Sequence, residues 1–268
     1  MNDRIRPALP AVRGERLRDK VAFVTGIGAG IGRGIAELFA QQGARVVGCD
    51  IDAAAAAATV AEAATRGAAI DSLQPVDLTD PADVARYVEF GIARHGRIDV
   101  LVNAAAFGVF EPLATMSYER GWRRTLVGEL DVVFLACQAA WPHLIANGGG
   151  AILNFASANA YVALESSPAI AHCAGKGGVL AMTRQIAAEG AAHGIRANTI
   201  SPALVETAAT RGPLDHVPGF RDQVMRKLML KRLGQPADIA WAALYLCSDE
   251  ASWVTASDFR IDGGATAW

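Results

Sequence analysis

The chain has 268 residues, of which 52% are hydrophobic and 19% are charged. An apolar content this high excludes an intrinsically disordered chain, and the length suffices for a domain with a substantial core. Lysine and arginine number 25 against 27 acidic residues, a net charge of −2, which gives no sign of a basic nucleic-acid-binding surface. We therefore expect a globular protein with no nucleic-acid partner.

The N-terminal residues 1–18 contain several arginines but no apolar stretch of the kind found in a secretory signal, so we expect an extension that precedes a domain at 19–268. The uncharged stretch 132–164 is interrupted by Pro142 and by a glycine run at 148–150. This pattern favours a buried helix, a turn and a buried strand over a membrane span.

The cysteines are far apart and show neither a CxxC pair nor the spacing of metal ligands. We therefore expect reduced thiols in a cytoplasmic protein, with no metal site. The four cysteines are Cys49, Cys137, Cys173 and Cys247.

Short apolar runs alternate with longer helical stretches along the whole chain. Expected strands lie at 20–25, 45–50, 70–76, 98–103, 150–156, 195–201 and 258–261. Expected helices lie at 31–42, from 53 to about 67, from about 81, from 132, at about 168–193 and at 236–248. Alternation of this kind predicts a parallel sheet covered on both faces. No linker or repeat divides the chain, so we expect one α/β domain, a doubly wound (Rossmann) fold with a seven-stranded sheet.

A glycine-rich turn, TGIGAGIG at 25–32, directly follows the first expected strand. Glycines there let backbone N–H groups and a helix N-terminus approach a pyrophosphate. Asp50 ends the next strand, where a carboxylate accepts the ribose hydroxyls and repels a 2′-phosphate. The spacing predicts a site for NAD; the alternative is a purely structural turn followed by a strand-end aspartate.

These motifs resemble those of the classical short-chain dehydrogenase/reductase family over about residues 17–264. The resemblance extends to Val76-Asp77-Leu78, to Leu101–Ala106, to Asn198–Ala203 with Thr207, and to the Asp-Gly-Gly at 262–264. It implies a substrate lid at about 204–228. It also implies cofactor contacts from Gly26, Gly28, Gly30, Ile31, Gly32, Asp50, Ile51, Asp77, Leu78, Asn103, Lys176, Pro202, Val205 and Thr207.

The expected active site departs from the family's pattern. The family uses a serine, a tyrosine and a lysine four residues after the tyrosine, assisted by an asparagine on the preceding helix. Ser157 and Lys176 match, but His172 stands in place of the tyrosine and Glu129 in place of the asparagine. The resemblance thus implies an atypical Glu-Ser-His-Lys site.

His172 and Lys176 are four residues apart and therefore share one face of a helix. A neutral imidazole is a reasonable acceptor for the alcohol proton as hydride leaves, with Ser157 or a water bridging the shorter ring. Glu129 either offsets the positive charge around His172 or forms a salt bridge that holds Lys176 away from the chemistry. The alternative for His172 is that it is inert.

The pocket is expected to be largely apolar, which suits a hydrophobic alcohol or ketone. Its expected lining is Phe107, Phe110, Asn159, Tyr161, Leu164, Leu204 and 207–226. We expect an NAD(H)-dependent oxidoreductase that interconverts a hydrophobic secondary alcohol and the ketone. Two alternatives stay open: an NAD-binding protein that has lost catalysis and has a binding or regulatory role, and a non-redox lyase on the same scaffold.

Alanines on two helices favour close packing between subunits, so a homo-oligomer, either a tetramer or a dimer, is expected. These alanines are Ala136, Ala139, Ala140, Ala181, Ala187 and Ala188.

Overall fold

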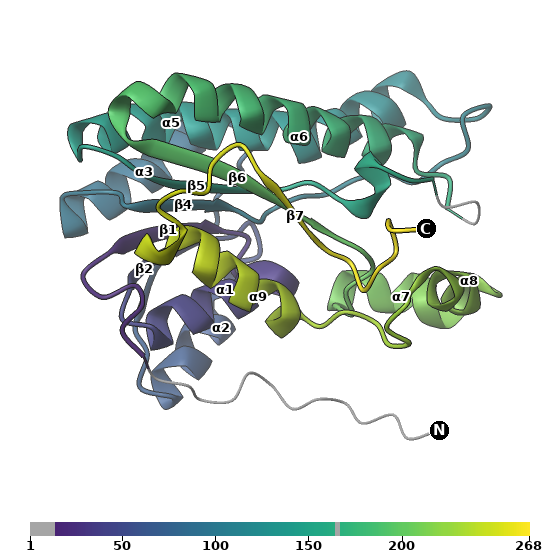
Figure 1. The fold of residues 1–268 in the computed structure, drawn as a ribbon, viewed down its shortest axis with the longest axis horizontal. Coiled ribbons are helices and arrows are strands. Elements are labelled where there is room, and N and C mark those ends of the chain that lie inside the picture. Colours follow the sequence, from purple (N-terminus) through teal and green to yellow (C-terminus); the bar gives the residue numbers. More distant parts are fainter. Residues whose placement is uncertain (1–13, 164–166) are drawn as a thin grey trace.

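A computed structural model describes residues 14–163 and 167–268. The described residues form one doubly wound α/β domain with a seven-stranded parallel sheet in the order β3-β2-β1-β4-β5-β6-β7 (Figure 1). The strands are β1 (Val21–Thr25), β2 (Arg45–Cys49), β3 (Ile70–Leu73), β4 (Val100–Asn103), β5 (Gly150–Phe155), β6 (Ile195–Pro202) and β7 (Asp258–Ile261). The fold predicted from the sequence is confirmed.

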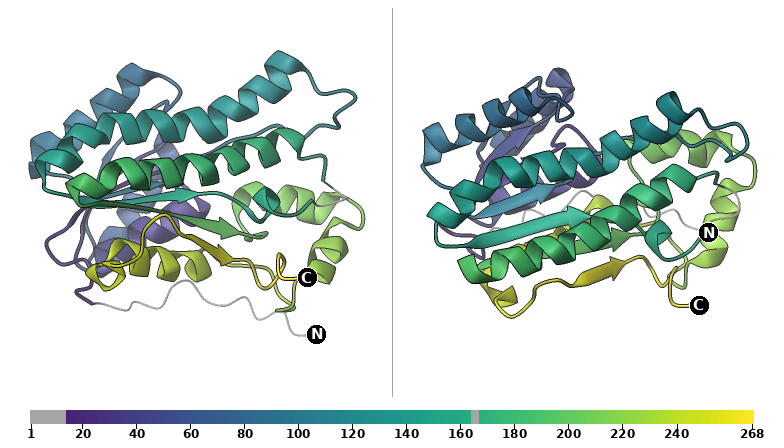
Figure 2. Two further views of the ribbon diagram at one scale, coloured as in Figure 1. Left: turned by 45° about the horizontal axis from the view of Figure 1, so that its top comes forward. Right: turned by 90° about the horizontal axis from the view of Figure 1, so that it is seen from above.

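Helices cover both faces of the sheet. One layer holds α1 (Gly30–Gln41), α2 (Ala53–Thr65) and α9 (Pro236–Cys247); the other holds α3 (Pro81–His95), α5 (Val132–Ala146) and α6 (Ile170–Gly190) (Figures 1 and 2). Two separate apolar clusters fill the spaces between the sheet and these layers. Because both faces are covered, a central strand such as β1 is buried along its whole length.

The strand order reverses between β1 and β4, which are neighbours in the sheet. Ligands of doubly wound sheets bind at such a switch point, beyond the carboxyl ends of the strands. Two further helices, α7 (Ala208–His216) and α8 (Phe220–Lys227), lie beyond these ends (Figure 1). The two helices lie in the segment, about 204–228, for which the family resemblance implies a substrate lid. They were not predicted as helices from the sequence.

Local sequence signals set most element ends. Asp80 accepts a hydrogen bond from the Ala82 amide with Pro81 at the first helical position, and Gly96 ends α3 in the left-handed region. The strand expected at 70–76 ends at Leu73, because Pro75 has no N–H for the ladder.

The helix before β5 begins earlier than expected and is irregular. A continuous helical segment runs through η1 (Tyr118–Arg123), α4 (Arg124–Leu126) and η2 (Val127–Asp131) into α5, and both η1 and η2 have π-helical hydrogen bonding. Such wider turns change which face of a helix each following side chain occupies, and they are frequent at functional sites. Glu129 lies in η2.

The small residues expected at a subunit interface are partly internal. Ala136, Ala140 and Ala187 are at most 2% exposed and pack inside the chain, which corrects the expectation that they form an outward face. Small side chains there bring α5 and α6 close to the sheet. Ala181 and Ala188 are exposed.

Residues 14–18 lie against the domain. Leu17 is fully buried, and its amide donates a hydrogen bond to the Gln42 carbonyl. Arg16 forms a salt bridge with Glu250. The rest of the predicted extension over 1–18, residues 1–13, lies outside the described residues.

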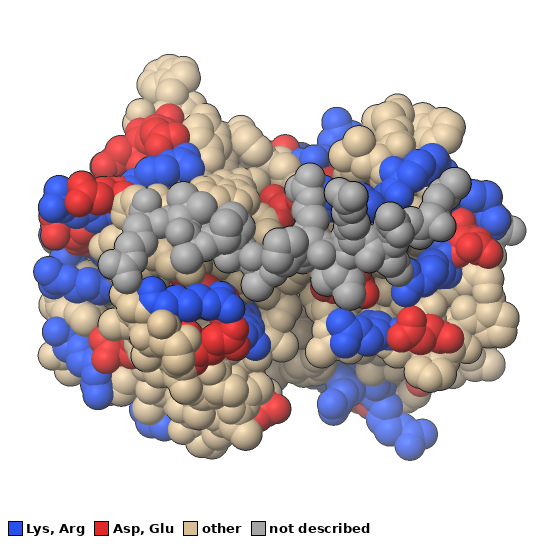
Figure 3. All heavy atoms as spheres, turned by 90° about the horizontal axis from the view of Figure 1, so that it is seen from below, with Lys and Arg blue, Asp and Glu red and all other residues tan. Residues whose placement is uncertain are grey.

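Acidic and basic side chains are interspersed over the described surface visible in Figure 3. Within the described residues, no helix has the length and apolar content needed to cross a membrane.

Candidate active site

The turn after β1 packs too tightly for side chains at two of its glycines. A Cβ on Gly32 would lie 2.2 Å from the Gly26 carbonyl oxygen, and Gly26 itself has a φ of 74°. The turn therefore approaches the start of α1 as bare backbone, which leaves room and N–H groups for a phosphate.

Asp50, at the end of β2, reaches this turn. Its Oδ2 accepts a hydrogen bond of 2.8 Å from the Gly28 amide, and its Oδ1 accepts one from the Asp52 amide. The carboxylate is thereby fixed beside the turn while remaining part-exposed. Its position suits recognition of ribose hydroxyls.

Other predicted cofactor residues surround the same turn. A Cβ on Gly30 would lie 3.1 Å from Cγ2 of Thr207, which places the segment after β6 against the glycine loop. The Thr25 hydroxyl accepts from the amides of Ala104 and Ala105, which hold the segment after β4 close to it.

The remaining cofactor candidates differ in exposure. Asp77 accepts two hydrogen bonds from Thr79, and Ile51 is 65% exposed. The side chain of Asn103 is buried and donates to Asn154 and to the Cys137 sulfur. Leu78, Pro202 and Val205 are buried.

A dinucleotide fits these residues. The bare backbone of the turn, the fixed Asp50 carboxylate and the adjacent Thr207 form a cradle at the switch point, and it begins at the N-terminus of α1.

The atypical catalytic candidates meet in a continuous chain of contacts. Nδ1 of His172 on α6 lies 2.6 Å from Oε1 of Glu129, and Nε2 lies 3.3 Å from Oγ of Ser157, which follows β5. A carboxylate can only accept, so the proton sits on Nδ1, and in the neutral ring Nε2 accepts from the Ser157 hydroxyl. The structure thus brings together three residues that the sequence predicted separately.

Two glycines make room for the Glu129 carboxylate. A Cβ on Gly108 would lie 2.9 Å from Oε1, and a Cβ on Gly175 would lie 2.9 Å from Oε2. Glu129 is 3% exposed, and its Oε2 has no hydrogen-bond partner among the described residues. Sequence reasoning missed these glycines, although Gly175 stands directly before Lys176.

Lys176 is buried and donates 3.1 Å to the carbonyl of Phe155, two residues before Ser157. Burial lowers the pKa of its ammonium, and the negative charge of Glu129 opposes that shift. No salt bridge joins Glu129 to Lys176 among the described residues, so the expected alternative of a direct pair is not what the structure has.

An aromatic side chain, Phe110, lies next to His172. The Phe110 ring is 5.3 Å from the imidazole, and both Phe110 and Phe107 are about half exposed. Tyr161, expected in the pocket, instead donates its hydroxyl to Asp258 on β7. Leu164, another expected pocket residue, lies outside the described residues.

The fold, the glycine turn and the polar cluster at the strand ends together define a dinucleotide-binding oxidoreductase. A family profile described as enoyl-(acyl carrier protein) reductase matches residues 26–266, and the chain belongs to the short-chain dehydrogenase/reductase family.

Two characterised relatives align over nearly their whole length. The D-threitol dehydrogenase of Mycolicibacterium smegmatis is 39% identical, with 94% of each chain covered. The cyclohexanol dehydrogenase of an Acinetobacter species is 34% identical, with 96% of this chain and 98% of the relative covered.

Among solved structures, a 7α-hydroxysteroid dehydrogenase complexed with NADH and a 7-oxo bile acid superposes with a TM-score of 0.87. It is 34% identical and covers 93% of this chain and 95% of its own.

Proposed function

We propose that the protein is an NAD(H)-dependent dehydrogenase that interconverts a hydrophobic secondary alcohol and its ketone. The observation that carries the proposal is the contact chain Glu129–His172–Ser157, which ends at the carboxyl edge of the sheet beside the dinucleotide cradle. Bound NAD would supply the hydride acceptor.

In this proposal, His172 is the base. Glu129 holds the proton on Nδ1, which leaves Nε2 free to take a proton passed from the substrate hydroxyl through Ser157. Ser157 positions the substrate oxygen and transmits its proton. Lys176 is a buried cation that favours the anionic form of an oxygen held near Ser157.

NAD is proposed over NADP because Asp50 is fixed against the Gly28 amide. A 2′-phosphate would meet this carboxylate at close range, and the like charges would repel. The complex with NADH of the related 7α-hydroxysteroid dehydrogenase supports the same cofactor.

A hydrophobic substrate is proposed because Phe110 is half exposed next to His172, and Phe107, three residues earlier, is also part-exposed. By their names, the two relatives act on alcohols of different polarity: one on a polyol, D-threitol, and the other on the apolar alcohol cyclohexanol. The lid proposed for 204–228 would cover this region.

The test measures reduction of NAD and, separately, of NADP with three substrates: cyclohexanol, a hydroxysteroid and D-threitol. We expect kcat/KM to be highest with NAD and an apolar alcohol. If D-threitol were turned over faster than the apolar alcohols, the proposed preference for hydrophobic substrates would be wrong, but the dehydrogenase activity would stand. NADH binding without turnover of any alcohol would favour the binding or regulatory role, and loss of water from a substrate without change in NADH would favour a lyase.

We also propose a homo-oligomer in the cytoplasm. Phe134 and Ile145 are exposed on α5 and supply an apolar face, in place of the buried alanines. The four cysteines are free, which suits a reducing compartment. A monomeric mass by light scattering at micromolar concentration would contradict the oligomer.

A further inference from the structure

Three side chains at the proposed site have the relationship of a hydrolytic triad. Ser157 carries a hydroxyl, His172 contacts it through Nε2, and Glu129 contacts the opposite ring nitrogen. A nucleophile within reach of a base that is itself oriented by a carboxylate is the common signature of an activated serine.

The imidazole is oriented from two sides. Its Nδ1 bond to Glu129 is short at 2.6 Å, and the Phe110 ring packs 5.3 Å from its centre. Gly108 and Gly175 leave only enough space for the carboxylate, so Glu129 is held in place by backbone on both sides. Nε2 therefore points at Ser157 without a competing partner in the described structure.

We propose that Ser157 is also a nucleophile, which gives the protein a hydrolase activity toward small, uncharged carboxylic esters that needs no cofactor. Ser157 Oγ attacks the ester carbonyl carbon while its proton moves to Nε2 of His172. The tetrahedral adduct then expels the alcohol, which takes that proton, and leaves an acyl group on Oγ. Water, deprotonated by His172, releases the carboxylic acid and restores the serine.

The surroundings suit an apolar ester. Phe110 supplies an exposed aromatic ring beside the base, and the ring carries no charge. The buried ammonium of Lys176 bonds the carbonyl two residues before Ser157 and supplies positive charge for the developing oxyanion. This reaction is independent of the proposed dehydrogenase function, because it uses neither NAD nor hydride transfer.

The experiment measures hydrolysis of p-nitrophenyl acetate by the cofactor-free protein, with peptide mass spectrometry to locate the acetyl group. A fluorophosphonate probe gives a second, serine-directed readout. We expect acetyl and probe on Ser157, and at least a 100-fold loss of hydrolysis in both Ser157→Ala and His172→Gln. Cys173→Ser is the matched control, because this thiol follows His172 directly; it should hydrolyse the ester like the wild type.

Binding of NADH by each variant shows that it has folded. A wild type that hydrolyses the ester no faster than Ser157→Ala overturns the proposal, as does an acetyl group found on Cys173 or His172 instead. Alcohol oxidation measured on the same preparations separates the two functions: oxidation without labelling of Ser157 rejects only the hydrolase activity, and labelling without oxidation rejects only the dehydrogenase.

Discussion

Oε1 of Glu129 lies 2.6 Å from Nδ1 of His172, and the two residues come from helices separated by a whole strand of the sheet. The contact is buried, since Glu129 is 3% exposed. A buried carboxylate is costly unless it is paired, and the imidazole is the partner that the described structure provides. The pair therefore fixes both the position and the protonated nitrogen of the ring.

Replacing Glu129 by glutamine tests this positioning role. Glu129→Gln removes the charge but keeps the size, so we expect kcat for alcohol oxidation to fall by about 10²-fold with little change in NADH affinity. Steady-state kinetics and calorimetric titration measure the two quantities. An unchanged kcat, or a loss confined to NADH binding, would show that Glu129 is only structural.

The sheet and the dinucleotide cradle were predictable because their signals are local. Alternating apolar runs, the glycines after β1 and the aspartate at the end of β2 each lie within a short stretch of sequence. The glycines and the aspartate need only the geometry of one strand–helix–strand unit to come together. The seven-stranded doubly wound architecture follows from the same alternation.

The contacts of the catalytic candidates were less predictable. Glu129 lies in π-helical η2, and wide helical turns have no reliable sequence signal. Tyr161 was placed in the pocket by its distance from Ser157, but its hydroxyl bonds Asp258, which comes from a strand 97 positions later. Ala136, Ala140 and Ala187 were assigned outward but are buried, because periodicity alone does not tell which apolar face meets the sheet.

A methyl group at Gly175 is expected to displace the Glu129 carboxylate. The new Cβ would lie 2.9 Å from Oε2, closer than a normal contact. Gly175→Ala should therefore lower kcat by about tenfold or more through the His172 contact. In Gly177→Ala, the matched control two residues along α6, the new Cβ meets nothing within 4 Å.

The control should instead raise the free energy of unfolding by roughly 0.5–1 kcal/mol, because alanine favours a helix over glycine. Thermal unfolding and kcat measured on both variants separate the effects. Equal kcat values for the two variants would argue against a carboxylate held in place by Gly175.

Asp50 is expected to determine cofactor choice. Asp50→Ala removes the hydrogen bond from the Gly28 amide and the negative charge beside it. We expect NADH affinity to fall by about tenfold and the preference over NADPH to narrow. Calorimetric titration with both cofactors is the measurement. Asp52→Ala is the control, because Asp52 caps α2 nearby; it should cost about 1 kcal/mol of stability and leave the preference unchanged.

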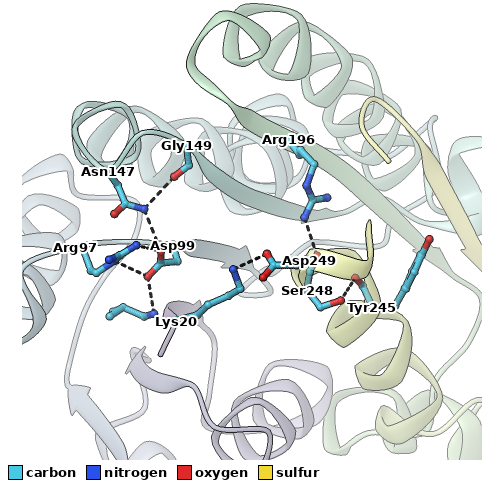
Figure 4. Close-up of polar contacts among 10 residues, drawn as sticks. Lys20, Arg97, Asp99, Asn147, Gly149, Arg196, Tyr245, Ser248 and Asp249 are labelled. Carbon is cyan, nitrogen blue, oxygen red and sulfur yellow. Dashed lines mark hydrogen bonds and ion pairs between the residues drawn. The ribbon is translucent and has the colours of Figure 1, made fainter. Parts of the chain in front are cut away.

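The amino ends of the strands, opposite the proposed site, are held by a polar cluster around Asp99 (Figure 4). Asp99 accepts from the Val21 amide, from Arg97 and from Asn147, and it is 8% exposed. Burial alone would raise the pKa of this carboxyl, but the hydrogen bonds from these three groups outweigh it and hold the pKa below its ordinary value of 3.8.

This depressed pKa gives Asp99 a stabilising contribution that is present above its ordinary pKa and is lost as the pH falls through the folded-state value. Asp99→Asn keeps the shape but removes the charge, so we expect the free energy of unfolding at neutral pH to fall by about 1–3 kcal/mol. The gap between wild type and variant should narrow as the pH falls below about 4, where protonation makes the wild-type carboxyl neutral as well. Urea unfolding of both proteins at a series of pH values measures this difference in the free energy of unfolding. A gap that stays constant between neutral and acidic pH would mean that Asp99 stabilises the strand ends through packing and not through its charge.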